Sequence, residues 1–348
     1  MVRKLAYRRS PAQDNGVVPD GTIRVSPLMN LPEILREFGC DPQDVFAKSG
    51  FTLDQFKEPD TEISYTAGSK LLANCLAVTG AQHLGLLIGE RANMSTLGIA
   101  GFIARSALTV GAGLRDLVHN LDLHDQGGSP TLETRGSVTL LGYCVHQPGV
   151  EAIDLIYDIA LAQGCNILRD LTGGNLNLSE VMLSRRAPRD LAPYRRFFRA
   201  PLRFDSEQNA VVFPTCWLDH PLTSADPLLH HHLVKEANEL HNHRPEDTIE
   251  ILRRLLRKSL PSRKIAVNHI ASQLCLHERT LHRRLQESGT TYRRELETVR
   301  YEVARQMLAG SRTTLPKIAK ALGYTDVSTL IRAFKRWSVM TPAQWRET

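Results

Sequence analysis

The stretch IASQLCLHERTLHRRL, residues 270–285, predicts two short helices joined by a tight turn. Ala271 is small at a point where two helices must cross closely, and Leu281 and Leu285 lie four residues apart, on one face of the second helix. We therefore expect a helix-turn-helix unit over about residues 266–287, ended by Gly289. The outer face of its second helix then carries three polar residues, Arg279, His282 and Arg283.

The pattern recurs in IAKALGYTDVSTLIRAF, residues 318–334, which predicts a second unit over about residues 315–338. Ala319 takes the place of Ala271, and Leu330 and Phe334 take the places of the two core leucines. The position of Cys275 is held here by Gly323, which suits a turn with positive φ. Cys275 is a poorer residue for that conformation, so the first turn is expected to be slightly strained or to avoid it.

A long amphipathic helix is predicted between the two units. Leu296, Val299, Val303 and Met307 recur at spacings of three and four, and Gly310 is expected to end the helix. Such a helix would span about 25 Å, enough to hold two recognition helices about one DNA turn, roughly 34 Å, apart.

Charge is unevenly distributed along the 348 residues, whose formal net charge is +6. Residues 251–348 contain 20 Lys and Arg against 7 Asp and Glu, whereas the preceding residues are net acidic. A basic C-terminal domain beside an acidic one predicts a polyanionic partner for the C-terminal part alone. Together with the two helix-turn-helix patterns, this charge indicates that the partner is double-stranded DNA.

The remaining composition favours a cytoplasmic protein. The six cysteines form no C-x-x-C pair, so reduced thiols are expected. No apolar stretch suggests a signal peptide or a membrane span.

The rest of the chain predicts an α+β domain. Residues 1–22 are polar and are expected to be a disordered tail. Helical spacing dominates from Leu31 to about Gly113. Two strands are predicted to turn near Gly136, followed by a helix over about 150–171 and short strands at 181–183 and 210–213. Residues 227–240 look helical, and 231–247 are assigned to a linker.

Residues 264–346 resemble the DNA-binding domain of AraC/XylS-type regulators. The matching motifs are IA at 270, LHR at 281, RYEVA at 300, IA at 318, LGY at 322, RAFK at 332 and TP at 341. The chain departs from the usual pattern at Leu330, where the family often has Phe. Residues 26–230 resemble, less specifically, the effector domain of the subgroup that includes ornithine-utilisation regulators. That match is carried by LGLLIGE at 84, LG at 97, YRRFF at 194, NAVVFP at 209, LD at 218 and PL at 221.

The resemblance implies the functional residues. Base reading would fall, by position, on Arg279, His282 and Arg283 in the first unit and on Val327, Ser328, Ile331 and Arg332 in the second. Arginine can form bidentate hydrogen bonds with guanine, whereas Val327 and Ile331 offer only apolar contacts, so the second unit is expected to read sequence less strictly. Phosphate contacts are expected from Lys317, Lys320, Lys335 and Arg336, and either phosphate contacts or helix capping from His277 and Thr280.

The predicted architecture is an α+β effector-sensing domain over residues 23–230 and an all-α DNA-binding domain over 248–348. A transcriptional regulator of this kind would bind a small-molecule effector and contact RNA polymerase, and self-association is left open. No catalytic residue, metal ligand or cofactor is expected, and the effector pocket residues are unknown. An amino acid, a fatty acid and other metabolites all remain open as the effector.

Two other hypotheses about the function compete with that of a transcriptional regulator. Thirteen histidines, among them His230, His231 and His232, invite an enzyme with a metal site, but three adjacent residues cannot share one helix face. A pure ligand-binding or protein-docking module is the other, against which the arginine-rich outer faces argue, since docking helices usually present apolar anchors.

Overall fold

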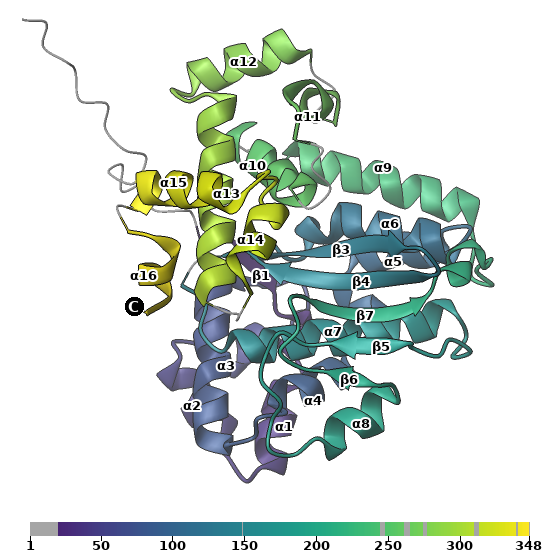
Figure 1. Ribbon diagram of the computed structural model, residues 1–348. Helices are drawn as coiled ribbons and strands as arrows, with labels where there is room; N and C mark the ends of the chain where they lie inside the picture. The colour runs from purple at the N-terminus through teal and green to yellow at the C-terminus, as the bar shows by residue number, and fades with distance from the viewer. Residues whose placement is uncertain are drawn as a thin grey trace, which may run out of the picture. The chain divides into compact units, whose positions relative to one another are not determined.

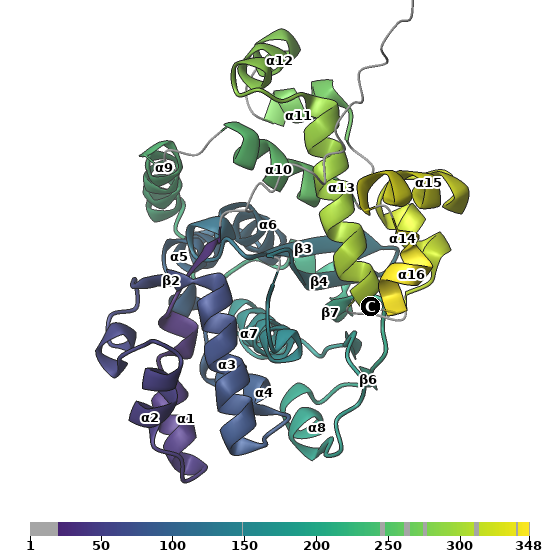
Figure 2. The ribbon, with the colours of Figure 1, turned by 90° about the vertical axis from the view of Figure 1, so that its left-hand side faces the viewer.

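The structure is a computed structural model that describes residues 20–147, 149–243, 248–260, 265–273, 277–309, 313–338 and 340–347. The chain divides into two compact units, whose described parts are residues 20–243 and the residues from 248 onward. Figures 1 and 2 show the helices and strands of both units in two views.

The N-terminal unit is α+β, as predicted. Its helices are α1 (Leu31–Glu37), α2 (Pro42–Lys48), α3 (Tyr65–Thr79), α4 (Leu84–Arg91), α5 (Ile99–Ser106), α6 (Val110–Asn120), α7 (Ile153–Leu171), α8 (Ala192–Phe198) and α9 (Pro227–His243). Its strands are β1 (Thr22–Arg24), β2 (Glu62–Ser64), β3 (Gly128–Arg135), β4 (Val138–Val145), β5 (Glu180–Met182), β6 (Leu202–Arg203) and β7 (Asn209–Pro214).

A five-stranded sheet in the order β3-β4-β7-β5-β6 forms one side of this unit. Its pairs are antiparallel except β5 with β6, and the predicted turn at Gly136, with φ of 61°, joins β3 to β4. β1 and β2 form a separate two-stranded sheet, which the helical spacing of this region did not predict. Helices α7 and α6 both pack on this sheet, α7 along β4 and β7 and α6 against β3.

Two glycines let α4 and α7 cross closely. A Cβ on Gly85 would lie 2.3 Å from the carbonyl oxygen of Leu155, and one on Gly89 would lie 2.6 Å from that of Ile159. Both distances are too short for real atoms, so only glycine fits. The LGLLIGE motif therefore sets the position of α7 against the helical layer.

Two predicted boundaries of this unit differ from the structure. Residues 20–22, assigned to the disordered tail, are ordered, because Asp20 accepts hydrogen bonds from Ser64 and Thr66. The linker assigned to 231–247 is helical as far as His243, since α9 packs Ala237 against Ile103 of α5. Because α9 is rich in polar residues, the few apolar side chains that pack it against α5 were not recognised from the sequence. Residues 1–19 and 244–247 lie outside the described residues.

The C-terminal unit is helical throughout its described residues. It contains α10 (Thr248–Ser259), α11 (Val267–Gln273), α12 (Glu278–Glu287), α13 (Tyr292–Ala309), α14 (Leu315–Ala321), α15 (Val327–Ser338) and α16 (Pro342–Glu347). One core joins them, in which Leu281, Leu285, Val299, Leu330 and Phe334 are at most 1% exposed. Gly310, the predicted end of α13, lies outside the described residues.

Part of the basic charge of this unit is structural. Arg253 and Arg257 on α10 pair with Glu295 and Glu302 on α13, at 2.7 and 2.9 Å. Glu295 is 3% exposed and also accepts a hydrogen bond from Thr290. Buried carboxylates need such partners, so these arginines hold α10 on the long helix.

Candidate nucleic-acid interface and effector cavity

Helix α12 presents the first set of predicted DNA contacts. Leu281 and Leu285 are fully buried, and their burial turns Arg279, His282 and Arg283 to the exposed face. Glutamate carboxylates lie one helical turn away from two of them: His282 is 3.7 Å from Glu278, and Arg283 is 3.7 Å from Glu287. The side chain of Arg283 is nevertheless 70% exposed, so its guanidinium is accessible.

The start of α12 is capped by His277. Its Nδ1 accepts a hydrogen bond from the backbone N–H of Arg279 at 3.2 Å, which satisfies one donor of the first turn. His277 thus performs the capping half of the role predicted for it, and Thr280 lies half-buried in the same turn. Cys275 and the turn that precedes His277 lie outside the described residues.

Helix α15 presents the second set. Leu330 and Phe334 are buried, while Ser328 and Arg332 are exposed and Val327 and Ile331 are half-buried. The turn before it contains Gly323 with φ of 74°, as predicted for a glycine at this position.

The N-cap of this helix is Asp326, which was not predicted from the sequence. Its carboxylate accepts hydrogen bonds from the backbone N–H and the hydroxyl of Thr329, both at 2.8 Å, and these lower the pKa of Asp326. An Asp followed three residues later by Thr is the signal that could have identified it.

Arg300 connects the spacer helix to the second unit, a role that the sequence did not suggest. Its Nε donates to the carbonyl oxygen of Leu322 at 3.0 Å, and its guanidinium lies 4.6 Å from the centre of the Tyr324 ring. The contact fixes the turn between α14 and α15 on α13, so the orientation of α15 depends on the long helix.

Glu297 gathers a second group of arginines on α13 and α15. Arg336 donates to its Oε1 at 2.9 Å, and Nε of Arg293 lies 3.5 Å from the same oxygen. These residues line a groove together with Arg332. Arg336, a predicted phosphate contact, is therefore shared with a carboxylate, although about half of its side chain remains exposed.

The predicted lysine contacts are all at the surface. Lys317 and Lys320 lie on α14 and Lys335 lies on α15, each exposed. In both views α12 lies beyond the N-terminal end of α13, whereas α15 lies beside α13 and packs on it (Figures 1 and 2). The predicted residues thus form two separate cationic surfaces connected by one helix of about 27 Å.

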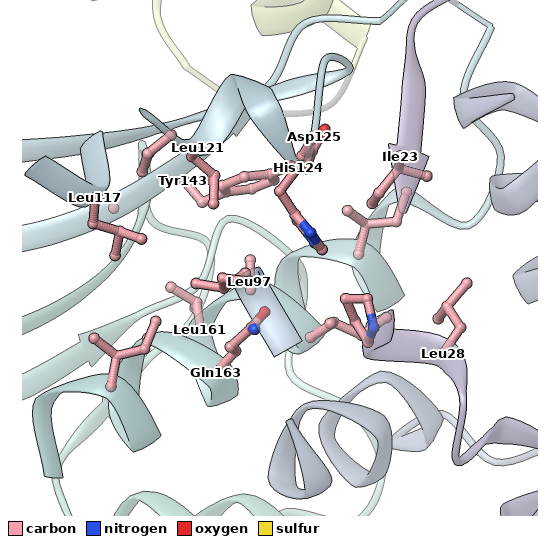
Figure 3. Close-up of a pocket in the computed structure, with 18 of the residues that line it drawn as sticks. Ile23, Leu28, Leu97, Leu117, Leu121, His124, Asp125, Tyr143, Leu161 and Gln163 are labelled. Carbon is pink, nitrogen blue, oxygen red and sulfur yellow. The ribbon is translucent and has the colours of Figure 1, made fainter. Parts of the chain in front are cut away.

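The N-terminal unit contains a largely apolar cavity of about 110 Å³ (Figure 3). Its walls come from α3, α6, α7, β4 and the segments around β1 and 94–97, with side chains such as Leu28, Leu97, Leu117, Leu121 and Leu161. One water molecule needs roughly 15 Å³ of such space, so the cavity can hold a small organic ligand. The sequence did not identify these residues as a pocket, because they come from segments far apart in the chain.

Three polar side chains of the cavity wall are bonded to one another. The Tyr143 hydroxyl donates to Asp125, and the hydroxyls of Tyr143 and Tyr65 lie 3.3 Å apart. Asp125 also accepts from the backbone N–H groups of Gly127 and Gly128. Burial outweighs these hydrogen bonds and raises the pKa of Asp125 to about 6.

The histidine run lies on α9. His230 pairs with Asp116 of α6 at 2.9 Å, and the rings of His231 and His232 contact each other. Among the described residues, no group of three or more His, Cys, Asp or Glu side chains is arranged to hold a metal ion. Within the same residues, no single helix has the length and apolar character to cross a bilayer, although the bent pair α3 and α4 does when taken together.

Comparison with known proteins agrees with this architecture. Residues 39–222 match the model described as the arabinose-binding N-terminal domain of AraC transcription regulators, and residues 270–348 match a helix-turn-helix domain model. The chain is 28% identical over 327 residues to the HTH-type transcriptional regulator VirS of Mycobacterium tuberculosis, covering 93% of this chain and 96% of VirS.

It is 26% identical over 329 residues to the ornithine utilization regulator of Pseudomonas aeruginosa, covering 91% and 94% of the two chains. The crystal structure of the transcriptional regulator CdpR from Pseudomonas aeruginosa aligns with a TM-score of 0.43 at 22% identity, covering 90% and 98% of the two chains. The N-terminal model alone spans more than half of the sequence, and the second covers the C-terminal unit from α11 onward. The chain belongs to the AraC family of DNA-binding transcription regulators.

Proposed function

We propose that this regulator reads a specific duplex with two recognition helices, α12 and α15, each inserted into the major groove. The observation that carries the proposal is the shared construction of the two helices. Each buries two core side chains four residues apart and exposes a face with arginine, Arg279 and Arg283 on α12 and Arg332 on α15. Arginine is the side chain best suited to guanine in that groove.

The two helices have different chemistry. α12 offers two arginines and a histidine, all hydrogen-bonding groups, whereas α15 offers Val327 and Ile331 beside Ser328 and Arg332. Apolar side chains can contact only features such as the thymine methyl. The base pairs under α12 are therefore read more strictly than those under α15.

Phosphate contacts position the protein on the duplex. Lys317, Lys320, Lys335 and Arg336 are exposed around the second unit, and His277 and Thr280 lie at the start of α12. Such contacts strengthen binding to every sequence and make it sensitive to salt.

The cavity of the N-terminal unit is the proposed effector site. It is mostly apolar and is built from three helices, the sheet and β1, so that an occupant would stabilise the whole unit. An occupied unit would then change how the cytoplasmic protein, alone or as a homodimer, presents its DNA-binding unit and contacts RNA polymerase.

Selection of duplexes from a random pool by the full-length chain tests the DNA-binding part of this proposal. We expect a recovered motif with two half-sites about ten base pairs apart, bound less tightly as salt concentration rises. Recovery of no common motif would contradict it.

A further inference from the structure

The effector cavity contains two polar side chains, His124 and Gln163, whose hydrogen-bonding capacity the protein uses only in part. His124 and Gln163 are 5% and 7% exposed, yet each directs hydrogen-bonding atoms into the cavity. Figure 3 shows the His124 ring and the Gln163 amide pointing into the same space from opposite walls. Buried polar groups are normally paired, so unpaired ones in a cavity wall indicate the place of a ligand group.

The orientation of Gln163 is fixed by its neighbours. Its Nε2 donates to the hydroxyl of Thr96 at 2.8 Å and to the carbonyl oxygen of Asn93 at 3.4 Å. The Thr96 hydroxyl itself donates to that same carbonyl, so it can only accept from Gln163. The amide therefore cannot be reversed, and its oxygen faces the cavity as an acceptor that needs a donor.

His124 supplies the complementary group. Burial, with a contribution from the charge of Arg24, lowers the pKa of His124 to about 3, so the ring is neutral. Among the described residues the buried Nδ1 of the ring has no hydrogen-bond partner. A neutral imidazole has one donor and one acceptor nitrogen. Since Nδ1 is fully buried, Nε2 is the nitrogen that can donate to an oxygen atom of a ligand in the cavity.

Charged ligands find no partner in this cavity. Of the side chains that line it, only Asp125 carries a carboxyl group and none belongs to Lys or Arg. Asp125 already accepts from Tyr143, Gly127 and Gly128. A carboxylate, and therefore an amino acid such as ornithine, would be buried without a cation, which is costly.

Polyhydroxylated ligands fit no better. The hydroxyl of Ser69, another polar lining group, donates to the backbone carbonyl oxygen of Thr66 and accepts from the backbone N–H of Glu151. A sugar such as arabinose would bury several hydroxyls against leucines and isoleucines, where they would lose their hydrogen bonds to water.

We propose that the cavity takes an uncharged, largely apolar small molecule with one hydroxyl group, which donates to Gln163 and accepts from His124. The inference rests on the proposed function in that it takes this cavity to be the effector site. An alkyl chain or ring of the ligand would occupy the leucine-lined remainder.

A series of five- and six-carbon probes tests the inference by isothermal titration of the full-length chain. Hexan-1-ol should bind about tenfold more tightly than 1-methoxypentane, which has the same number of heavy atoms but no donor for Gln163. Hexanoate, hexylammonium, L-ornithine and L-arabinose should bind more weakly still. Equal affinity for the ether, or tighter binding of hexanoate, hexylammonium, ornithine or arabinose than of hexan-1-ol, would overturn the proposal, as would no binding of the alcohol.

Variants localise the binding. Gln163→Met and His124→Phe should each weaken hexan-1-ol about tenfold, whereas Gln208→Met, on a glutamine outside the cavity, should leave it unchanged. Equal affinities of wild type, Gln163→Met and His124→Phe would overturn the assignment. Binding of the selected duplex is measured in parallel with each probe present. If a probe other than the alcohol changes the affinity for the duplex, the proposed ligand class is wrong, but the proposal that the N-terminal unit senses an effector still stands.

Discussion

Glu297 on α13 accepts a hydrogen bond from Arg336 on α15 at 2.9 Å, so a carboxylate lies within the cationic surface of the second helix-turn-helix unit. The same carboxylate lies 3.5 Å from Arg293. A negative charge here both orients two arginines and opposes the approach of phosphates.

Replacement of that charge should strengthen DNA binding in general. Glu297→Gln keeps the shape of the side chain but removes its electrostatic repulsion of the DNA phosphates. It also releases Arg336 and Arg293 for contacts with those phosphates. We expect severalfold tighter binding to every sequence and a steeper dependence of affinity on salt. Titrations at several salt concentrations measure both effects. Glu37→Gln, in the N-terminal unit beside Arg91, is the control, and weaker binding by Glu297→Gln would contradict this account.

Arg283 and Lys335 should differ in what their loss does to specificity. Arg283→Ala is expected to relax discrimination at one base pair by about 1–3 kcal/mol, because it removes a bidentate contact with guanine. Lys335→Ala should weaken all sequences alike, because a phosphate contact carries no sequence information. A panel of singly substituted duplexes distinguishes the two, and an equal loss on every duplex for Arg283→Ala would count against base contact.

The close crossing of α4 and α7 predicts intolerance at Gly85. Gly85→Ala would place a Cβ 2.3 Å from the carbonyl oxygen of Leu155, so the helices must separate. We expect the free energy of unfolding to fall by about 2 kcal/mol. Gly164→Ala, whose new Cβ would lie 3.6 Å from a methyl group of Leu141, is the matched control and should leave stability unchanged or raise it. Denaturant titrations compare them, and equal stabilities would refute the crossing geometry.

Asp125 should make stability fall as pH rises from about 4 to about 6. Burial raises its pKa in the folded chain to about 6, above the value of an exposed carboxyl, so the folded state retains a proton that the unfolded chain has lost. The expected loss is about 2–3 kcal/mol over that window. His124 titrates with the opposite sign in the same range, because its folded pKa is lowered.

The variant Asp125→Asn isolates this contribution. It keeps the size of the side chain and cannot ionise, so the difference in melting temperature between it and the wild type should change between pH 4 and 6 and be constant above. Asp54→Asn, at a fully exposed carboxylate, serves as control. A difference that is independent of pH would show that Asp125 is already ionised at pH 4.

The sequence predicted most where local pattern and burial coincide. The spacing of Leu281 with Leu285 and of Leu330 with Phe334 specified α12 and α15 and their outer faces, since a helix repeats its faces at fixed intervals. The turn at Gly136 and the positive φ of Gly323 were also predictable, because few residues other than glycine adopt that backbone conformation.

Long-range relationships were not predictable. β1 pairs with β2 through residues about forty positions apart, and α9 is held by tertiary contacts of Ala237 with Ile103 on α5 and of His241 with Asp122. His124 and Gln163 both line the cavity although they lie far apart in the chain. The oxygen of the Gln163 amide is free because its Nε2 is bonded to Thr96, which no sequence motif indicates. Such features depend on tertiary packing, which leaves little signal in local periodicity.

Hydroxyl-radical footprinting of the full-length chain on its selected duplex tests the central claim most directly. Two protected patches about one helical turn apart on the same face are predicted, with Arg283→Ala exposing one patch and Arg332→Ala exposing the other. A single protected patch, or loss of the same patch in both variants, would contradict the assignment of α12 and α15 to successive turns of one duplex.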